Sequence, residues 1–86
     1  MITAHLSGES LVIDDLRVTG PGLIDMVLLG RKVPVISSGQ NVGTAWISDK
    51  LLHVRSVSQH LIMPRKYLMG ILDGGIVSAR VQEVPV

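Results

Sequence analysis

The fold of this chain is decided by residues 57–72, which read Val57-Ser58-Gln59-His60-Leu61-Ile62-Met63-Pro64-Arg65-Lys66-Tyr67-Leu68-Met69-Gly70-Ile71-Leu72. Apolar residues recur there and just upstream at spacings of three and four, the period of an amphipathic helix, at Leu51, Val54, Val57 and Leu61. Pro64 then starts a second helical pattern, because proline is favoured in the first turn of a helix, where its missing N–H is not needed. The sequence therefore predicts two short helices separated by a tight break.

The residues after this segment extend the pattern to a larger motif. Asp73-Gly74-Gly75 ends the second predicted helix, and either glycine suits a left-handed helix cap. Residues 76–84 alternate between apolar and polar side chains, which is typical of a strand. Helix, turn, helix, glycine and strand together make the layout of a winged helix-turn-helix. We therefore expect an α+β fold.

The N-terminal half is expected to contain more strand than helix. Residues 2–6 and 11–18 favour a β-hairpin, and residues 23–29 favour a short helix capped by Gly30, with a buried strand as the alternative. Residues 33–36 form an extended piece in which Pro34 suits an edge strand.

The division of the chain is expected at one flexible stretch. Residues 37–43 are rich in serine, glycine and asparagine, which is typical of a loop. We therefore interpret residues 1–43 as a β-rich dimerisation or partner-binding segment and residues 44–86 as the winged helix-turn-helix segment. Together they are expected to form one compact domain.

The composition indicates association with other copies. Of the 86 residues, 47% are hydrophobic and only 17% are charged, which is more apolar surface than a small monomer easily hides. A homodimer or a higher oligomer is therefore expected. The chain has no cysteine, which excludes disulfides and thiolate metal sites. It shows neither a signal peptide nor an apolar run long enough to span a bilayer, so we expect a cytoplasmic protein with no membrane partner.

The cations of the C-terminal half suggest a nucleic-acid partner. This half has five cations against three acids, whereas the first half has three cations against four acids. Arg65 and Lys66 stand where a helix-turn-helix presents residues to the DNA major groove. The guanidinium of arginine can donate two hydrogen bonds to the edge of guanine, and the ammonium of lysine acts as a point charge on the DNA phosphate backbone. We therefore predict double-stranded DNA as the partner, with Tyr67, Arg80 and Arg55 as phosphate contacts.

A family resemblance agrees with this interpretation. The runs Leu52-His53-Val54-Arg55-Ser56-Val57-Ser58-Gln59-His60-Leu61, Met63-Pro64-Arg65-Lys66-Tyr67-Leu68 and Ile71-Leu72-Asp73-Gly74-Gly75 resemble the excisionase-type (MerR-like) DNA-binding domain. The resemblance implies a small transcriptional regulator with a winged helix-turn-helix. Because such domains also occur in the antitoxins of toxin–antitoxin pairs, it implies in addition a toxin or other protein partner.

The sequence offers little sign of catalysis or metal binding. His5, His53 and His60 fall on separate predicted elements, and the spacing from 53 to 60 is not that of two ligands on a helix. No nucleophile motif or phosphate loop is present, and so short a chain rarely builds a catalytic cleft alone. We expect no enzyme, no catalytic residues, no cofactor and no metal site.

One alternative stays open from the composition. Twenty of the 86 residues are valine or isoleucine, and such β-branched residues favour strands. If residues 48–72 form strands, the DNA hypothesis loses its basis. The better account is then a β-barrel or β-sandwich that acts as a homo-oligomeric structural or interaction module, such as a phage-type assembly protein.

Overall fold

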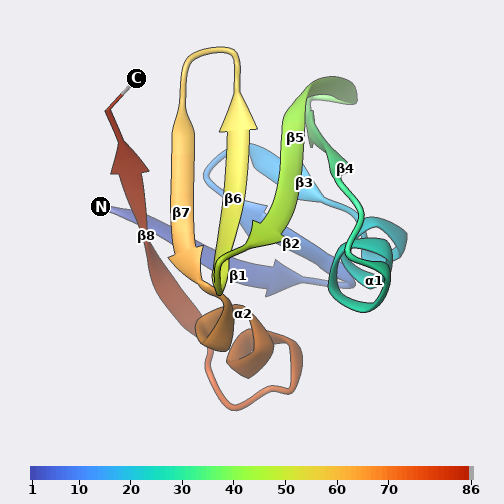
Figure 1. Ribbon diagram of the computed structural model, residues 1–86, viewed down its shortest axis with the longest axis vertical. Helices are drawn as coiled ribbons and strands as arrows, with labels where there is room; N and C mark the ends of the chain where they lie inside the picture. Colours follow the sequence, from blue (N-terminus) through green and yellow to red (C-terminus); the bar gives the residue numbers. More distant parts are fainter. Residues whose placement is uncertain (86) are drawn as a thin grey trace.

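The computed structural model describes residues 1–85 and consists of eight antiparallel strands closed into a barrel, with two short helices (Figure 1). The strands follow one another around the barrel in chain order, and β1 pairs with β8 to close it. Helix α1 connects β3 to β4, and helix α2 connects β7 to β8. The elements are β1 (Ile2–Ser7), β2 (Ser10–Ile13), β3 (Leu16–Val18), α1 (Gly20–Leu29), β4 (Val33–Ser37), β5 (Gln40–Ser48), β6 (Leu51–Ser56), β7 (His60–Pro64), α2 (Arg65–Leu72) and β8 (Ser78–Val84).

The predicted winged helix-turn-helix is wrong, because a β-hairpin stands in place of its first helix. β6 and β7 are antiparallel with Val54 opposite Leu61, and the N–H of Ser56 donates to the carbonyl of Gln59 at 2.9 Å in the turn. Alternate residues of both strands are buried, as expected of strands with one face on a core: Leu52, Val54, Leu61 and Met63. The α+β fold class is thus corrected to a mainly β barrel, which the β-branched composition had suggested as the alternative.

The alternation of this hairpin is hidden in the sequence because some of its outward positions are apolar too. Leu51 precedes the buried Leu52, Ile62 lies between the buried Leu61 and Met63, and both are half-buried on the outer face. They line a depression together with Tyr67 of α2. Apolar residues therefore occur on both faces of the strands. The spacing of three and four residues between Leu51, Val54, Val57 and Leu61 mixes inward and outward positions and does not reflect a helix.

Several other predicted elements are confirmed. The strands expected at residues 2–6 and 76–84 are β1 and β8, and the helix expected at residues 23–29 is α1. Gly30 caps α1 in the left-handed conformation, with φ of 66°. The second predicted helix exists as α2, which begins directly after Pro64.

Two predicted segments are divided differently in the structure. A turn in which Asp14 has φ of 54° separates β2 from β3 within the stretch that was expected to be one strand. The expected loop at residues 37–43 is mostly strand, because a tight turn at residues 38–39 joins β4 directly to β5. The boundary expected between residues 1–43 and residues 44–86 accordingly falls inside β5. The edge strand expected from Pro34 is wrong, because β4 pairs with both β3 and β5 in the closed barrel. Pro34 itself pairs with Thr44 of β5 and has no partner in β3, so its missing N–H interrupts no pairing there.

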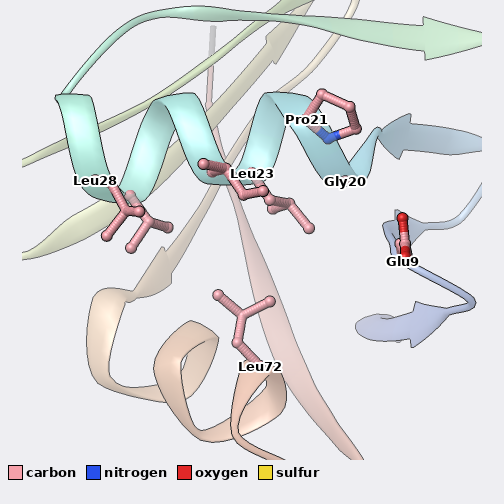
Figure 2. Close-up of a pocket in the computed structure, with 8 residues that line it drawn as sticks. Glu9, Gly20, Pro21, Leu23, Leu28 and Leu72 are labelled. Atoms are coloured by element: carbon pink, nitrogen blue, oxygen red, sulfur yellow. The ribbon is translucent and has the colours of Figure 1, made fainter.

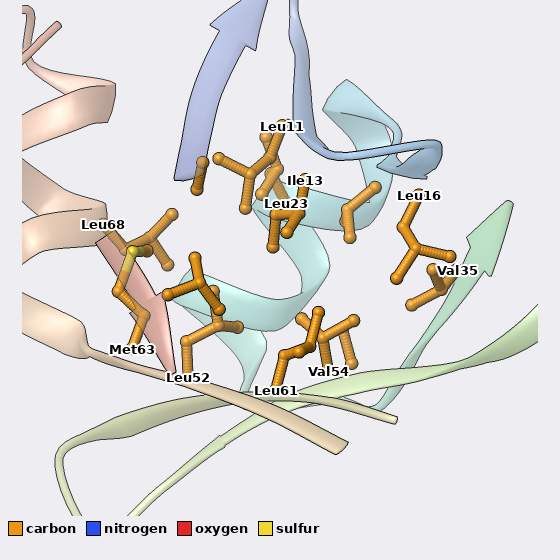
Figure 3. Packing of buried hydrophobic residues seen from close by; sticks show 14 of the residues in the cluster. Leu11, Ile13, Leu16, Leu23, Val35, Leu52, Val54, Leu61, Met63 and Leu68 are labelled. Carbon is orange, nitrogen blue, oxygen red and sulfur yellow. The ribbon is translucent and has the colours of Figure 1, made fainter. Parts of the chain in front are cut away.

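One apolar core fills the barrel and joins it to both helices (Figure 3). The interior of an eight-stranded barrel is just wide enough for side chains to fill. α1 adds Leu23 and Met26 to this core, and α2 adds Leu68 and Ile71. Within residues 1–85 no polar or charged residue is buried. The inside of the barrel is therefore a packed core, and functional groups must be sought on its outer surface.

Both helices lie at the same end of the barrel (Figure 1). The register places the β1–β2 turn, the β5–β6 turn and the start of β8 at this end as well, since Leu51 pairs with Pro64 and His5 pairs with Ser78. We call this the helix end. The β6–β7 turn lies at the opposite end. Within the described residues, neither helix is long and apolar enough to cross a membrane.

Candidate functional site

Helix α1 presents large apolar side chains to solvent. Its sequence, Gly-Pro-Gly-Leu-Ile-Asp-Met-Val-Leu-Leu, contains Asp25 as the one charged residue. Leu23 and Met26 point into the core, yet Ile24 is 58% exposed, Leu28 74% and Leu29 57%. A helix that is apolar on all sides is normally buried on all sides. The outer side of α1 therefore exposes large apolar side chains that are normally buried against another surface.

Helix α1 is capped at both ends, so its start and its end are well defined. The side chain of Thr19 accepts a hydrogen bond from the N–H of Gly22 at 3.2 Å, and Pro21 stands in the first turn. Gly30 ends the helix, as described above. Pro21, Ile24 and Leu28 are spaced by three and four residues, so they follow one stripe of the helix.

A groove of about 370 Å³ separates this stripe from α2 (Figure 2). Leu72 of α2 points toward α1 across the groove, and Glu9 of the β1–β2 turn stands at its border. Glu9 is the single charged residue of the lining. We call the groove and its exposed border the α1 face; it comprises Glu9, Gly20, Pro21, Leu23, Ile24, Val27, Leu28 and Leu72, with Leu29 next to them.

The remaining exposed apolar residues are scattered. Val57 in the β6–β7 turn is 96% exposed, Met1 before β1 is 90% exposed and Val77 before β8 is 89% exposed, and each stands on a different segment. Single exposed apolar side chains are ordinary on protein surfaces, whereas a contiguous patch indicates a contact. The α1 face is such a patch.

The predicted DNA-binding residues are brought together only in part. Arg65, Lys66 and Tyr67 form the first turn of α2, and the ammonium of Lys66 lies 5.3 Å from the centre of the Tyr67 ring. Tyr67 and Arg80 line the same depression on the outer face of the barrel. Arg55 stands apart, because it lies four residues along β6 from Leu51, or about 13 Å at the usual rise of a strand.

A group of cations nevertheless gathers at the helix end. Lys50, in the β5–β6 turn, borders one depression together with Arg65 and Lys66. The carbonyl of Lys50 accepts a hydrogen bond from the N–H of Arg65 at 2.9 Å, which ties the turn to the start of α2. Lys50 was not among the residues predicted from the sequence, because only the β5–β6 pairing brings it beside α2.

An aromatic and histidine cluster was also missed. Trp46 of β5 stacks on His53 of β6, with ring centres 5.0 Å apart and planes within 3°. Nδ1 of His53 lies 3.1 Å from Nε2 of His60 on β7. The prediction of a helix over this region placed the two histidines on different elements, whereas in a hairpin with a short turn they become neighbours. Prediction of this cluster would thus have required the pairing of β6 with β7.

Comparisons of the chain with models of protein families, with curated proteins and with solved structures found no match. The functional argument therefore rests on the surfaces described above.

Proposed function

We propose that this protein is a self-associating structural module whose α1 face packs against the α1 face of a second copy. The observation that supports this proposal is the exposure of Ile24, Leu28 and Leu29 on one helix beside an apolar groove. Burying a leucine or isoleucine side chain fully contributes about 1.5–3 kcal/mol. In a symmetric pair each side chain contributes twice, so a few such residues supply much of the association energy.

A second copy is the partner that best fits the chemistry of this face. The lining has no cation and only one acid, Glu9, at its border. A partner that recognises it must therefore be mainly apolar, and the α1 face itself meets that requirement. Two-fold pairing brings the same surface of both copies together and closes the assembly, which is the commonest arrangement among homo-oligomers.

The proposal is tested by sedimentation velocity over a range of protein concentrations. We expect the unaltered protein to sediment as a dimer or larger species, and Leu28→Lys to weaken association by at least about a hundredfold, or 2.7 kcal/mol. Val57→Lys is the matched control, because it adds the same charge at the other end of the barrel, at a residue that is even more exposed. A monomer at all concentrations, or equal sedimentation of Leu28→Lys and the unaltered protein, would refute the proposal.

Nucleic-acid binding is a second candidate, favoured by the cations Lys50, Arg65 and Lys66 around one depression. Without a helix-turn-helix, such binding would act through phosphates and would be strongly salt-dependent, with little sequence preference. Fluorescence anisotropy with a labelled duplex at low and physiological salt tests it. Binding that weakens in Arg65→Ala and Lys66→Ala but not in Arg31→Ala favours this candidate, and no binding at low salt rejects it.

The other sequence-based expectations stay predictions. These are the cytoplasmic location, the toxin or other protein partner implied by the resemblance, and the absence of enzymatic activity. The resemblance to the excisionase-type family implied a winged helix-turn-helix, but residues 51–64 instead form β6, β7 and their turn.

A further inference from the structure

The β6–β7 hairpin places two imidazole rings side by side on the outer face of the barrel. In the register, His53 is opposite Ile62 and Arg55 is opposite His60, so the two histidines are diagonal neighbours across the hairpin. Both alternate with the buried residues of their strands and therefore point outward. Nδ1 of His53 and Nε2 of His60 are 3.1 Å apart and share a hydrogen bond, in which one ring donates and the other accepts.

This separation matches that of two nitrogen ligands of one metal ion. Imidazole nitrogens bind Zn²⁺ at about 2.0–2.1 Å, so two of them lie roughly 2.8–3.4 Å apart for bond angles between about 90° and 109°. The observed 3.1 Å falls inside this interval. In the structure the contact is a hydrogen bond between the rings, so an ion must replace the shared proton, and both lone pairs must turn toward it, with the strands left where they are.

The ring of His53 is also held in place by its surroundings. Trp46 stacks on it from the neighbouring strand, and the ammonium of Lys32 lies 5.4 Å from the centre of the Trp46 ring on β5. Trp46 is tilted by 31° against His60, with ring centres 6.1 Å apart. A ring that is already oriented loses less freedom when it binds a ligand.

We propose that His53 and His60 form a two-nitrogen chelate for a divalent transition metal, with Cu²⁺ bound most tightly. Imidazole suits Cu²⁺, Ni²⁺ and Zn²⁺, whereas Ca²⁺ and Mg²⁺ prefer oxygen ligands. Among the described residues no third histidine, cysteine or carboxylate completes the set, so water or an external ligand fills the remaining positions. With two imidazole nitrogens as the ligands from the protein, the donor strength of nitrogen decides the choice of metal, and this follows the order that places Cu²⁺ first.

The protein contains its own reporter for this site. Trp46 is the only tryptophan of the chain, and it stacks directly on one of the two ligands. Paramagnetic Cu²⁺ bound at His53 and His60 quenches its fluorescence at contact range. Titration of the full chain with Cu²⁺ is expected to give saturable quenching with one ion per chain.

Two variants and one control test the assignment. His53→Ala and His60→Ala are each expected to weaken Cu²⁺ binding by more than about tenfold, because even the loss of a residue that only orients a metal ligand typically weakens binding about 10–100-fold. His5→Ala is the matched control, since it removes the third histidine, which lies exposed on β1. Circular dichroism of each variant verifies that the barrel remains folded.

Electron paramagnetic resonance gives a second readout that does not depend on tryptophan. Coupling of Cu²⁺ to two imidazole nitrogens in the unaltered protein, and its loss in His60→Ala, supports the chelate. Undiminished binding in the His53→Ala/His60→Ala double variant, or equal loss in His5→Ala, overturns it and assigns the copper to the N-terminus or to other surface groups. The proposal is independent of self-association, because the hairpin and its two histidines belong to one chain.

Discussion

At the scale of single residues, Gly43 of β5 is where the barrel leaves no room for a side chain. A Cβ atom at this position would overlap the carbonyl oxygen of Arg55 on β6, and backbone cannot move aside as a flexible side chain can. The pairing of β5 with β4 is also irregular here, with a shift between Val35 and Ile36. Glycine within a strand often marks such a close approach or bulge.

We therefore expect Gly43→Ala to lower the free energy of unfolding by about 1–3 kcal/mol or more, the usual effect of overpacking. Urea denaturation followed by circular dichroism measures the change. Gly75→Ala is the control, because the nearest atom to its Cβ would be the Oδ1 of the Asp73 side chain at 3.1 Å, with no backbone in the way. Similar losses of unfolding free energy in the two variants would contradict the close approach of β5 to β6 at Gly43.

At the scale of elements, the β6–β7 hairpin predicts an alternating pattern of sensitivity. Leu61 is fully buried, whereas its neighbour Ile62 is only half-buried on the outer face. We expect Leu61→Ala to destabilise the protein by about 2–5 kcal/mol, the range for large-to-small changes in a core. Ile62→Ala should have a clearly smaller effect in the same chemical denaturation experiment. Equal losses, or a larger loss for Ile62→Ala, would contradict the hairpin.

The N-terminus of α1 gives a second prediction at this scale. Because the Thr19 side chain accepts the N–H of Gly22, Thr19→Ala should lower stability by about 1 kcal/mol. If α1 is the contact between copies, the same variant should also weaken association, which sedimentation velocity measures. Thr3→Ala, an exposed threonine on β1, serves as the control for both. A variant that loses stability but associates normally would place the contact elsewhere.

The elements that the sequence predicted correctly are those with local signals. Pro64 and Gly74 mark the two ends of α2, and Gly30 marks the end of α1. The first predicted helix failed because Leu51 and Ile62 are apolar on the outer face, which removed the alternation that identifies a strand. A helix and a strand cannot be distinguished by periodicity when both faces of the strand are partly covered.

At the scale of the whole molecule, the site depends on contacts that no local pattern contains. The barrel closes by pairing Ile2 with Val81, and the groove joins Glu9, α1 and Leu72 from three distant parts of the chain. The high apolar content led us to predict association, which stays a prediction, and it did not indicate which surface would take part. Likewise, the pairing of His53 with His60 appears only after the strand register is known.

The central claim, that the α1 face is covered by a second copy, is tested most directly by hydrogen–deuterium exchange at several protein concentrations. The account predicts that backbone amides of residues 20–30 exchange more slowly as the concentration rises. Those of residues 56–59, in the β6–β7 turn at the other end of the barrel, should not change. Exchange in α1 that is independent of concentration, or slowing confined to another surface, would contradict it.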